Sequence, residues 1–226
     1  MRNLIFRLWK RWLEFLSKEE AGTSYAVHDF DYRHYYNVEN VRKGFKEHEA
    51  TNLFNHPSNR LLDLCQRHAH IRDTAVDIGC GAGWISARLS RDFRRVIAIE
   101  PSEKAIALAK EIFPASAYPN IEWHVGFAEE QLGALSLQTP ALFVTSVVLS
   151  HLLDDEVSKI CRAMNAVAPH GSILSFSENW GTESHKYMWH VRTPDWWQAQ
   201  LPGWELDFLG PMMVNAHRGF HGRKRR

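Results

Sequence analysis

A glycine-rich turn after an apolar run is the first feature of this chain that could do chemistry. Gly79, Gly81 and Gly83 follow an acidic residue, Asp77, near the end of the apolar run. Glycine lets the backbone reverse tightly and lets a ligand approach the bare main chain. A helical pattern begins at Trp84, and the amino end of a helix favours the phosphate or other polar part of a nucleotide. The spacing therefore indicates a nucleotide-type site, although glycine also serves turns that bind nothing.

A second acidic residue supports the same interpretation. The apolar run 96–99 ends in Glu100, and a carboxylate at the tip of the second strand can accept hydrogen bonds from both ribose hydroxyls of an adenosine. The glycines have the spacing G-x-G-x-G, which differs from the G-x-G-x-x-G of dinucleotide enzymes. Together these residues indicate an adenosine-containing ligand.

These motifs resemble those of the class I S-adenosylmethionine-dependent methyltransferases of the small-molecule type. Residues 76–86 match the first family motif and residues 96–102 the second. Three later segments follow in the family's order. Residues 120–129 resemble the third strand and its adenine loop, and residues 142–153 resemble the fourth strand with a V-L-x-H-L segment. Residues 168–178 resemble the turn before the fifth strand and the strand itself. The resemblance covers about residues 75–180. It implies an enzyme that uses S-adenosyl-L-methionine, releases S-adenosyl-L-homocysteine and needs no metal.

The resemblance also implies which residues hold the cofactor. Gly79 and Gly81 would admit its methionine portion, Gly83 would allow close packing of the next helix, and Glu100 would bind the ribose. Asp77 would bind the amino group, and the alternative is a carboxylate that caps the turn or helix. Further expected contacts come from the turn and from the loops after later strands: Cys80, Pro101, Phe127, Ala128, Glu129 and Ser146.

The adenine loop departs from the family pattern. Members often carry G-D-A after the third strand, and this acid meets the adenine amino group. Here the acid is replaced by Phe127. We expect backbone amides near Phe127 and Ala128 to meet the ring edge, and Glu129 to supply the carboxylate.

Three side chains are candidates for catalysis: His151, Glu178 and His190. A hydroxyl acceptor loses its proton during methyl transfer, and imidazole titrates near neutral pH. The resemblance places His151 at the mouth of the site, where it is either the general base or a structural histidine. Glu178 would neighbour the base or attract a cationic acceptor.

The acceptor class is indicated by the segment after the fourth strand. DNA and protein-glutamine N-methyltransferases carry D/N-P-P-Y there, and residues 145–151 do not. Aromatic, His and Arg side chains, Arg192 among them, are dense between His185 and Trp197. Aromatic faces stack on rings and Arg pairs with phosphate or carboxylate, which suits a sugar or a phosphorylated acceptor. The alternative is that these tryptophans pack as a small core.

We therefore expect methyl transfer to a small polar acceptor, with a hydroxyl oxygen of a saccharide or glycolipid as the first choice. The alternatives are an N-methyltransferase of a small amine or protein, and a non-catalytic cofactor-binding module that recruits partners.

Composition limits the partners and the compartment. The 226 residues, 45% hydrophobic and 23% charged, suit a single domain with a core. A net charge of +1 provides no bulk field for nucleic acid, so no DNA partner is expected. Three cysteines without paired spacing favour a reducing, cytoplasmic environment over a disulfide framework or a zinc site.

Apolar runs and helical patterns alternate from about residue 74, which predicts an α/β fold with a parallel sheet covered on both faces. With the resemblance, the expected architecture is a Rossmann-like seven-stranded sheet, mostly parallel with a C-terminal antiparallel strand. The strands are expected at 74–78, 95–99, 121–125, 141–146, 172–177, 204–209 and 213–226, and the helices at 84–91, 102–112 and 155–167.

We divide the chain into an N-terminal helical extension and lid, residues 1–70, and a methyltransferase domain, residues 71–226, with an acceptor-side insertion at about 179–203. Residues 1–16 show helical apolar spacing with a basic opposite face. Such a helix packs on the domain or on a second subunit, and docking on a membrane surface is the alternative. The segment is too short and too charged to span a bilayer.

Overall fold

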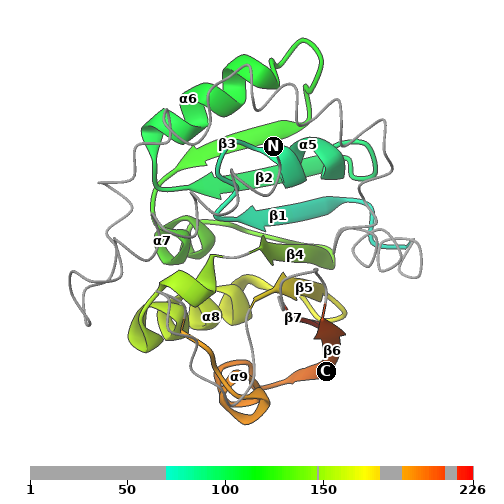
Figure 1. Ribbon diagram of the computed structural model, residues 1–226. Helices are drawn as coiled ribbons and strands as arrows, with labels where there is room; N and C mark the ends of the chain where they lie inside the picture. Colours follow the sequence, from blue (N-terminus) through cyan, green and yellow to red (C-terminus); the bar gives the residue numbers. More distant parts are fainter. Residues whose placement is uncertain (1–69, 147, 179–189, 212–217, 226) are drawn as a thin grey trace, which may run out of the picture.

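The computed structural model describes residues 70–146, 148–178, 190–211 and 218–225 (Figure 1). The predicted N-terminal extension, including the amphipathic segment 1–16, lies outside the described residues, as does the part of the insertion at 179–189. Their packing and any membrane contact stay predictions. None of the helices in the described ranges is long and apolar enough to cross a membrane.

Within the described residues, one seven-stranded sheet has the order β3-β2-β1-β4-β5-β7-β6 (Figure 1). Neighbours among the first five strands pair in parallel, whereas β7 is antiparallel to both β5 and β6. The predicted fold class is confirmed. The strands are β1 (Thr74–Ile78), β2 (Arg95–Glu100), β3 (Ile121–Val125), β4 (Ala141–Ser146), β5 (Ile173–Ser177), β6 (Trp204–Pro211) and β7 (Arg218–Lys224).

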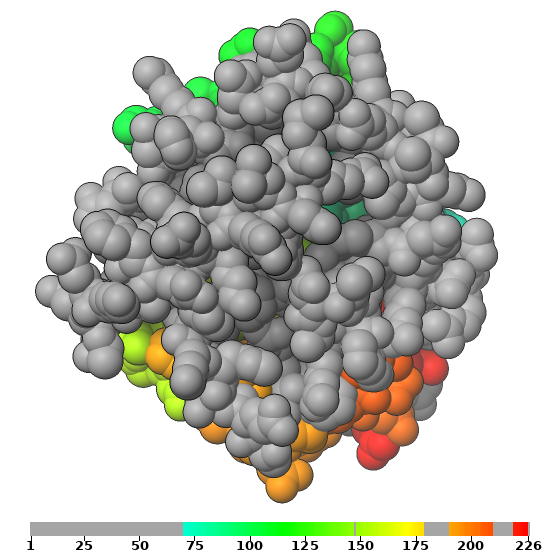
Figure 2. Space-filling view, in the orientation of Figure 1, coloured from blue at the N-terminus to red at the C-terminus, as the bar shows by residue number. Residues whose placement is uncertain are grey.

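The helices cover both faces of the sheet. Buried side chains of α7, α8 and α9 join one apolar cluster, and those of α5 and α6 join the cluster on the opposite face. In the space-filling view, α9 and β6 (orange) reach the surface at the lower edge (Figure 2). The helices are α5 (Trp84–Leu89), α6 (Glu103–Ile112), α7 (Ala128–Gly133), the 3-10 turn η3 (Leu149–His151), α8 (Asp154–Val167) and α9 (Pro194–Gln200).

Apolar residues at three of its five positions explain why β1 (sequence Thr-Ala-Val-Asp-Ile) lies inside the sheet, between β2 and β4. All five of its residues are buried, as expected for a parallel strand covered on both faces. Val76 and Ile78 contribute to one cluster and Ala75 to the other. The one acidic residue of the strand, Asp77, is therefore also buried, and it lies near the carboxyl end.

The strand order reverses beside β1, and this creates the place for a ligand. The chain passes from β1 to β2 and β3 on one side, then returns to β4 on the other side of β1. The helices that follow β1 and β4 lie on opposite faces, so the chain diverges at the carboxyl ends of these two strands. Ligands of open α/β sheets bind at such a switch point.

Candidate functional site

The glycine turn joins β1 to α5 at this edge of the sheet. Gly79, Gly81 and Gly83 have φ angles of 71°, 52° and 86°, a region that residues with side chains rarely adopt. The backbone N–H groups of Gly79 and Cys80 donate to the carbonyl of Ile99 at 2.8 and 3.0 Å. The turn is thereby tied to β2, one residue before Glu100.

The three glycines differ in what surrounds them. A Cβ on Gly79 would lie 2.5 Å from Cγ2 of Val148, and one on Gly83 would lie 2.5 Å from the ring of Trp123. A Cβ on Gly81 would meet none of the described residues within 4 Å. Gly83 thus allows the close approach of Trp123, on β3, and its predicted part in packing the next helix stays a prediction. Among the described residues, Gly81 is thus the glycine of this turn with open space beside its backbone.

Asp77 connects the end of β1 to α5, the helix that follows the glycine turn. Its side chain is buried, and its carboxylate accepts a hydrogen bond from Oγ of Ser86, on α5, at 2.6 Å. Burial raises the pKa of Asp77 from its ordinary 3.8 to about 7, although the hydrogen bonds from Ser86 oppose the shift; the charge of Glu100 adds to it. The alternative role predicted for Asp77, support of the turn, is present in the structure. Contact with a cofactor stays a prediction.

Glu100 faces the glycine turn from the tip of β2. It is buried, and its two carboxylate oxygens accept hydrogen bonds from the backbone N–H groups of Gly81 and Ser102, both at 3.1 Å. This placement agrees with the position that the resemblance gives to the ribose-binding acid.

The predicted adenine loop continues along the ends of β2 and β3. Phe127 precedes α7 and is 44% exposed, so it offers an apolar surface where the family often has an acid. Ala128 and Glu129, which follow it in the chain, are half-buried, as is Pro101 directly after β2. The backbone N–H of Gly126 donates to the carbonyl of Glu100 at 3.2 Å, which joins this loop to β2. Of the other predicted cofactor contacts, Cys80 is buried within the glycine turn and Ser146 is half-buried at the end of β4.

The turn after β4 lies directly beside the glycine turn, because Val148 is the neighbour of Gly79. This turn includes η3 and ends with His151, which is half-buried. The backbone N–H of His151 donates to the carbonyl of Val148 at 3.0 Å. The structure therefore brings the candidate base and the glycine turn to the same edge of the sheet.

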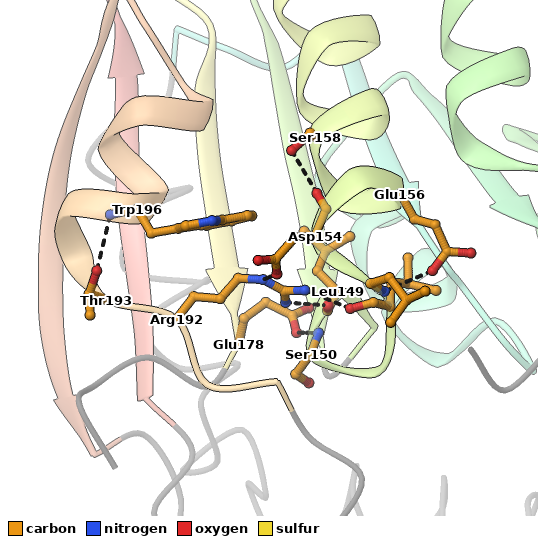
Figure 3. Close-up of polar contacts among 11 residues, drawn as sticks. Leu149, Ser150, Asp154, Glu156, Ser158, Glu178, Arg192, Thr193 and Trp196 are labelled. Carbon is orange, nitrogen blue, oxygen red and sulfur yellow. Dashed lines mark hydrogen bonds and ion pairs between the residues drawn. The ribbon is translucent and has the colours of Figure 1, made fainter. Parts of the chain in front are cut away.

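Glu178 has a different environment from the one predicted. It is fully buried, and its Oε1 accepts hydrogen bonds from Oγ1 of Thr145 at 2.6 Å and from the backbone N–H of Val148 at 3.0 Å. Its Oε2 accepts from the backbone N–H of Ser150 at 2.9 Å (Figure 3). Burial raises the pKa of Glu178 above its ordinary value, although these hydrogen bonds oppose the shift. The idea that Glu178 attracts a cationic acceptor is corrected, since its carboxylate points into the protein.

Arg192 also binds inside the protein. Its Nη1 and Nη2 donate to the carbonyls of Leu149 and Leu152 at 2.8 and 2.6 Å, and its Nε donates to Oδ1 of Asp154 at 2.8 Å (Figure 3). Only 4% of the residue is exposed. The suggestion that Arg192 binds a phosphate or carboxylate of the acceptor is therefore wrong. His190, the third catalytic candidate, is exposed, and its backbone N–H donates to the carbonyl of Ser150 at 2.7 Å.

The tryptophans of the insertion divide between core and surface. Trp197 is fully buried and packs against the rings of Phe176 and Phe220. This is the small core that was the alternative to a sugar platform. Trp196 is half-buried, and the guanidinium carbon of Arg192 lies 4.8 Å from its ring centroid. The aromatic residues within 179–189 lie outside the described ranges.

Residues 75–171 match the sequence model of a family described as a methyltransferase domain. This stretch of the chain is similar to a methyltransferase domain. The match spans β1 to the turn before β5, and it confirms the resemblance to the S-adenosylmethionine-dependent methyltransferases.

Solved structures share the fold of this methyltransferase domain. The amino pentose methyltransferase CalS10 from Micromonospora echinaspora is 15% identical, with a TM-score of 0.59 over 74% of this chain and 90% of that chain. DesVI from Streptomyces venezuelae is 13% identical, with a TM-score of 0.63 over 86% and 98%. The mitomycin 7-O-methyltransferase MmcR is 21% identical, with a TM-score of 0.56 over 68% and 49%. At these identities the likeness shows the fold alone. No curated protein sequence matches the chain.

Proposed function

We propose that the methyltransferase domain transfers the methyl group of S-adenosyl-L-methionine to a small polar acceptor, at a hydroxyl oxygen. The observation that carries the proposal is the contact between the glycine turn and the turn of His151, made by Gly79 and Val148. A cofactor seated on the glycine turn would have an imidazole at the same edge of the sheet. An imidazole is a suitable general base for a hydroxyl group near neutral pH.

The residues present fit this cofactor. The open position at Gly81 admits a ligand to the backbone, and Glu100 is a carboxylate at the place suited to ribose hydroxyls. Phe127 offers an exposed ring, and Glu129 a half-buried carboxylate, on the adenine side. Asp77 would hold the amino group. When bound, S-adenosyl-L-methionine supplies an electrophilic methyl group and leaves as S-adenosyl-L-homocysteine.

The chain's own contribution is then alignment and proton removal. Methyl transfer is an in-line displacement, so holding the acceptor oxygen in line supplies much of the rate. His151 would accept the proton that the hydroxyl group loses as its oxygen bonds to the methyl carbon. The exposed side chain of His190 is the second candidate for this proton.

Two observations support a small polar acceptor, with a saccharide or glycolipid as the first choice. The segment after β4 lacks the D/N-P-P-Y of enzymes that methylate planar amino groups. Among proteins of the same fold, CalS10 is an amino pentose methyltransferase and MmcR a mitomycin 7-O-methyltransferase. An amino pentose also carries an amino group, so N-methylation of a small amine is the alternative.

A labelled-methyl experiment separates these alternatives. The full chain is incubated with methyl-tritiated S-adenosyl-L-methionine and with three panels: saccharides and glycolipid head groups, small amines, and protein. Label in hydroxyl compounds that decreases with His151→Gln supports the proposal. Label confined to amines or protein would replace it with the alternative, and NMR of the product distinguishes O-methyl from N-methyl.

A further inference from the structure

The turn that carries His151 has little internal support. Within η3 and its ends, the N–H of His151 donates to the carbonyl of Val148 at 3.0 Å and that of Leu152 to the carbonyl of Leu149 at 3.3 Å. Hydrogen bonds of 3-10 geometry are weak, and three residues do not form a stable element on their own. The remaining polar groups of this buried backbone need partners elsewhere.

The charged side chains of Glu178 and Arg192 supply most of these partners from different parts of the chain, and the backbone N–H of His190 supplies one more, to the carbonyl of Ser150 at 2.7 Å. Glu178, directly after β5, accepts hydrogen bonds from backbone N–H groups at Val148 and Ser150. Arg192, shortly before α9, donates to the carbonyls of Leu149 and Leu152. An anion thus holds the donors of the turn and a cation holds its acceptors. Hydrogen bonds to charged groups are stronger than those between neutral groups.

Further contacts fix the orientation of both side chains. Thr145 of β4 donates to Glu178, and Asp154, the first residue of α8, accepts from Nε of Arg192. The ring of Trp196 lies against the guanidinium group, with 4.8 Å between the guanidinium carbon and the ring centroid (Figure 3). The planar fork of Arg192 can therefore reach two carbonyls and a carboxylate at once, which an ammonium group on a flexible stem does poorly.

We infer that Glu178 and Arg192 are positioning residues that hold the turn 148–152 and thereby set where the imidazole of His151 lies. The inference rests on the proposed function in one respect, the assignment of His151 as the base. The bracing of the turn itself does not depend on it. Because Arg192 lies on the acceptor-side insertion, the same contact connects that insertion to the candidate base.

The test uses the full chain and the variant Arg192→Lys, which keeps the charge but not the planar fork. Amide hydrogen exchange in 150–152 should become faster by about tenfold or more, because local opening no longer breaks the bonds to Arg192. In protein labelled with ¹³C-histidine, the imidazole signal of His151, assigned by its loss in His151→Gln, should shift or broaden. The signals of His124 and His170 should not move.

Arg95→Gln is the matched control. Arg95 also forms an arginine–carboxylate pair, with two bonds of 2.7 Å to Glu122, but the pair is exposed at the β2–β3 side of the sheet. This variant should leave the exchange of 150–152 and the His151 signal as in the wild type. Thr145→Val is a milder second variant, which removes one donor from Glu178, and it should disturb the same amides and the same histidine to a smaller extent.

Exchange rates and histidine spectra need no acceptor, so they test the bracing even if the acceptor proposal fails. An unchanged His151 signal and unchanged exchange in both Arg192→Lys and Thr145→Val would overturn the inference. Once an acceptor is known, Arg192→Lys should lower kcat about tenfold or more while the affinity for S-adenosyl-L-homocysteine changes less than about threefold. Equal losses in kcat and cofactor affinity would instead indicate a general structural role.

Discussion

The buried carboxylates of Asp77 and Glu100 lie on either side of the glycine turn in the sequence. The stability of the folded state is therefore expected to depend on pH. Burial raises the pKa of Asp77 to about 7 from an ordinary 3.8. Between these pH values the folded state retains a proton that the unfolded state has released. The free energy of unfolding therefore falls as pH rises through this window.

We predict that Asp77→Asn reduces this pH dependence, because the amide has no proton to lose. Across this window of about three pH units, at about 1.4 kcal/mol each, the free energy of unfolding of the wild type should fall by at most about 4 kcal/mol. Urea unfolding at pH 4, 5.5 and 7 covers this window and measures the change. Asp73→Asn, which removes an exposed partner of Arg94, is the control. If Asp77→Asn and Asp73→Asn keep the same slope as the wild type, Asp77 does not titrate in this window.

Glu100 is the residue whose loss should affect the cofactor most directly. We predict that Glu100→Gln weakens the affinity for S-adenosyl-L-homocysteine by roughly 1.5–3 kcal/mol, the usual range for a hydrogen bond to a charged group. Glutamine has a similar size, but its amide nitrogen cannot accept, so only one of the N–H groups of Gly81 and Ser102 keeps its partner. Calorimetry measures the dissociation constant, and Glu122→Gln on the exposed surface is the control. An unchanged constant for Glu100→Gln would mean that the carboxylate does not face the ribose.

His151 carries the acid–base part of the proposal. We predict that His151→Ala lowers turnover by about 10²–10⁴-fold, the typical contribution of a general base, with little change in cofactor affinity. Turnover as a function of pH, in wild type and variant, checks this once an acceptor is known. A variant that keeps most of its turnover and the same pH profile would make His151 a structural residue.

Sequence motifs identified the residues of the turn correctly but not the roles of Glu178 and Arg192. The glycine spacing and Glu100 were recognised from short stretches of sequence, since each follows directly after an apolar run. The bonds of Glu178 and Arg192 instead join residues 28 to 43 positions apart. A sequence shows that a charged residue is present, but only the fold shows whether a backbone turn or a ligand binds it.

At the scale of elements, the glycine turn and the turn after β4 form one packed unit. Gly79 has a φ of 71°, and a Cβ there would lie 2.5 Å from Val148. Gly81 has a φ of 52° and no described neighbour of its Cβ within 4 Å. Alanine at Gly81 would therefore introduce backbone strain alone, whereas alanine at Gly79 would introduce backbone strain and a steric clash.

We predict that Gly81→Ala costs about 1–2 kcal/mol of stability, from the left-handed backbone alone. Gly79→Ala should cost about 1–3 kcal/mol more, because the methyl group also overlaps Val148. Denaturant unfolding measures both values. The double change Gly79→Ala with Val148→Ala should recover part of the difference. Equal costs for the two glycine variants, or no recovery, would show that the packing of the two turns is not as described.

Most elements were predictable because their apolar patterns are long or continuous. The expected strand at 74–78 and helix at 155–167 agree with β1 and with α8, which begins one residue earlier. The short helices α7 and α9 were not predicted, since six or seven residues are too few for periodicity to decide. Thr193 followed by Pro194 was a usable signal for α9, because it is typical of a helix start.

At the scale of the whole molecule, the order of the strands determines where the chemistry can occur. The reversal between β1 and β4 gathers Glu100, the glycine turn and the turn of His151 at one edge of the sheet. The resemblance predicted the Rossmann-like fold class, but no strand order was predicted, since alternating strands and helices are compatible with several orders. The acceptor-facing residues are less predictable, because the segments at the two ends of the chain, where we expect the acceptor to bind, match no family motif.

The measurement that tests the central claim most directly is calorimetric titration of S-adenosyl-L-methionine and S-adenosyl-L-homocysteine into the full chain, treated with a chelator, at two temperatures. The account predicts saturable binding of one molecule per chain without added metal, since the glycine turn and Glu100 belong to the protein itself. Binding of neither compound to a chain that still unfolds cooperatively would contradict the assignment of the site and of the methyl donor.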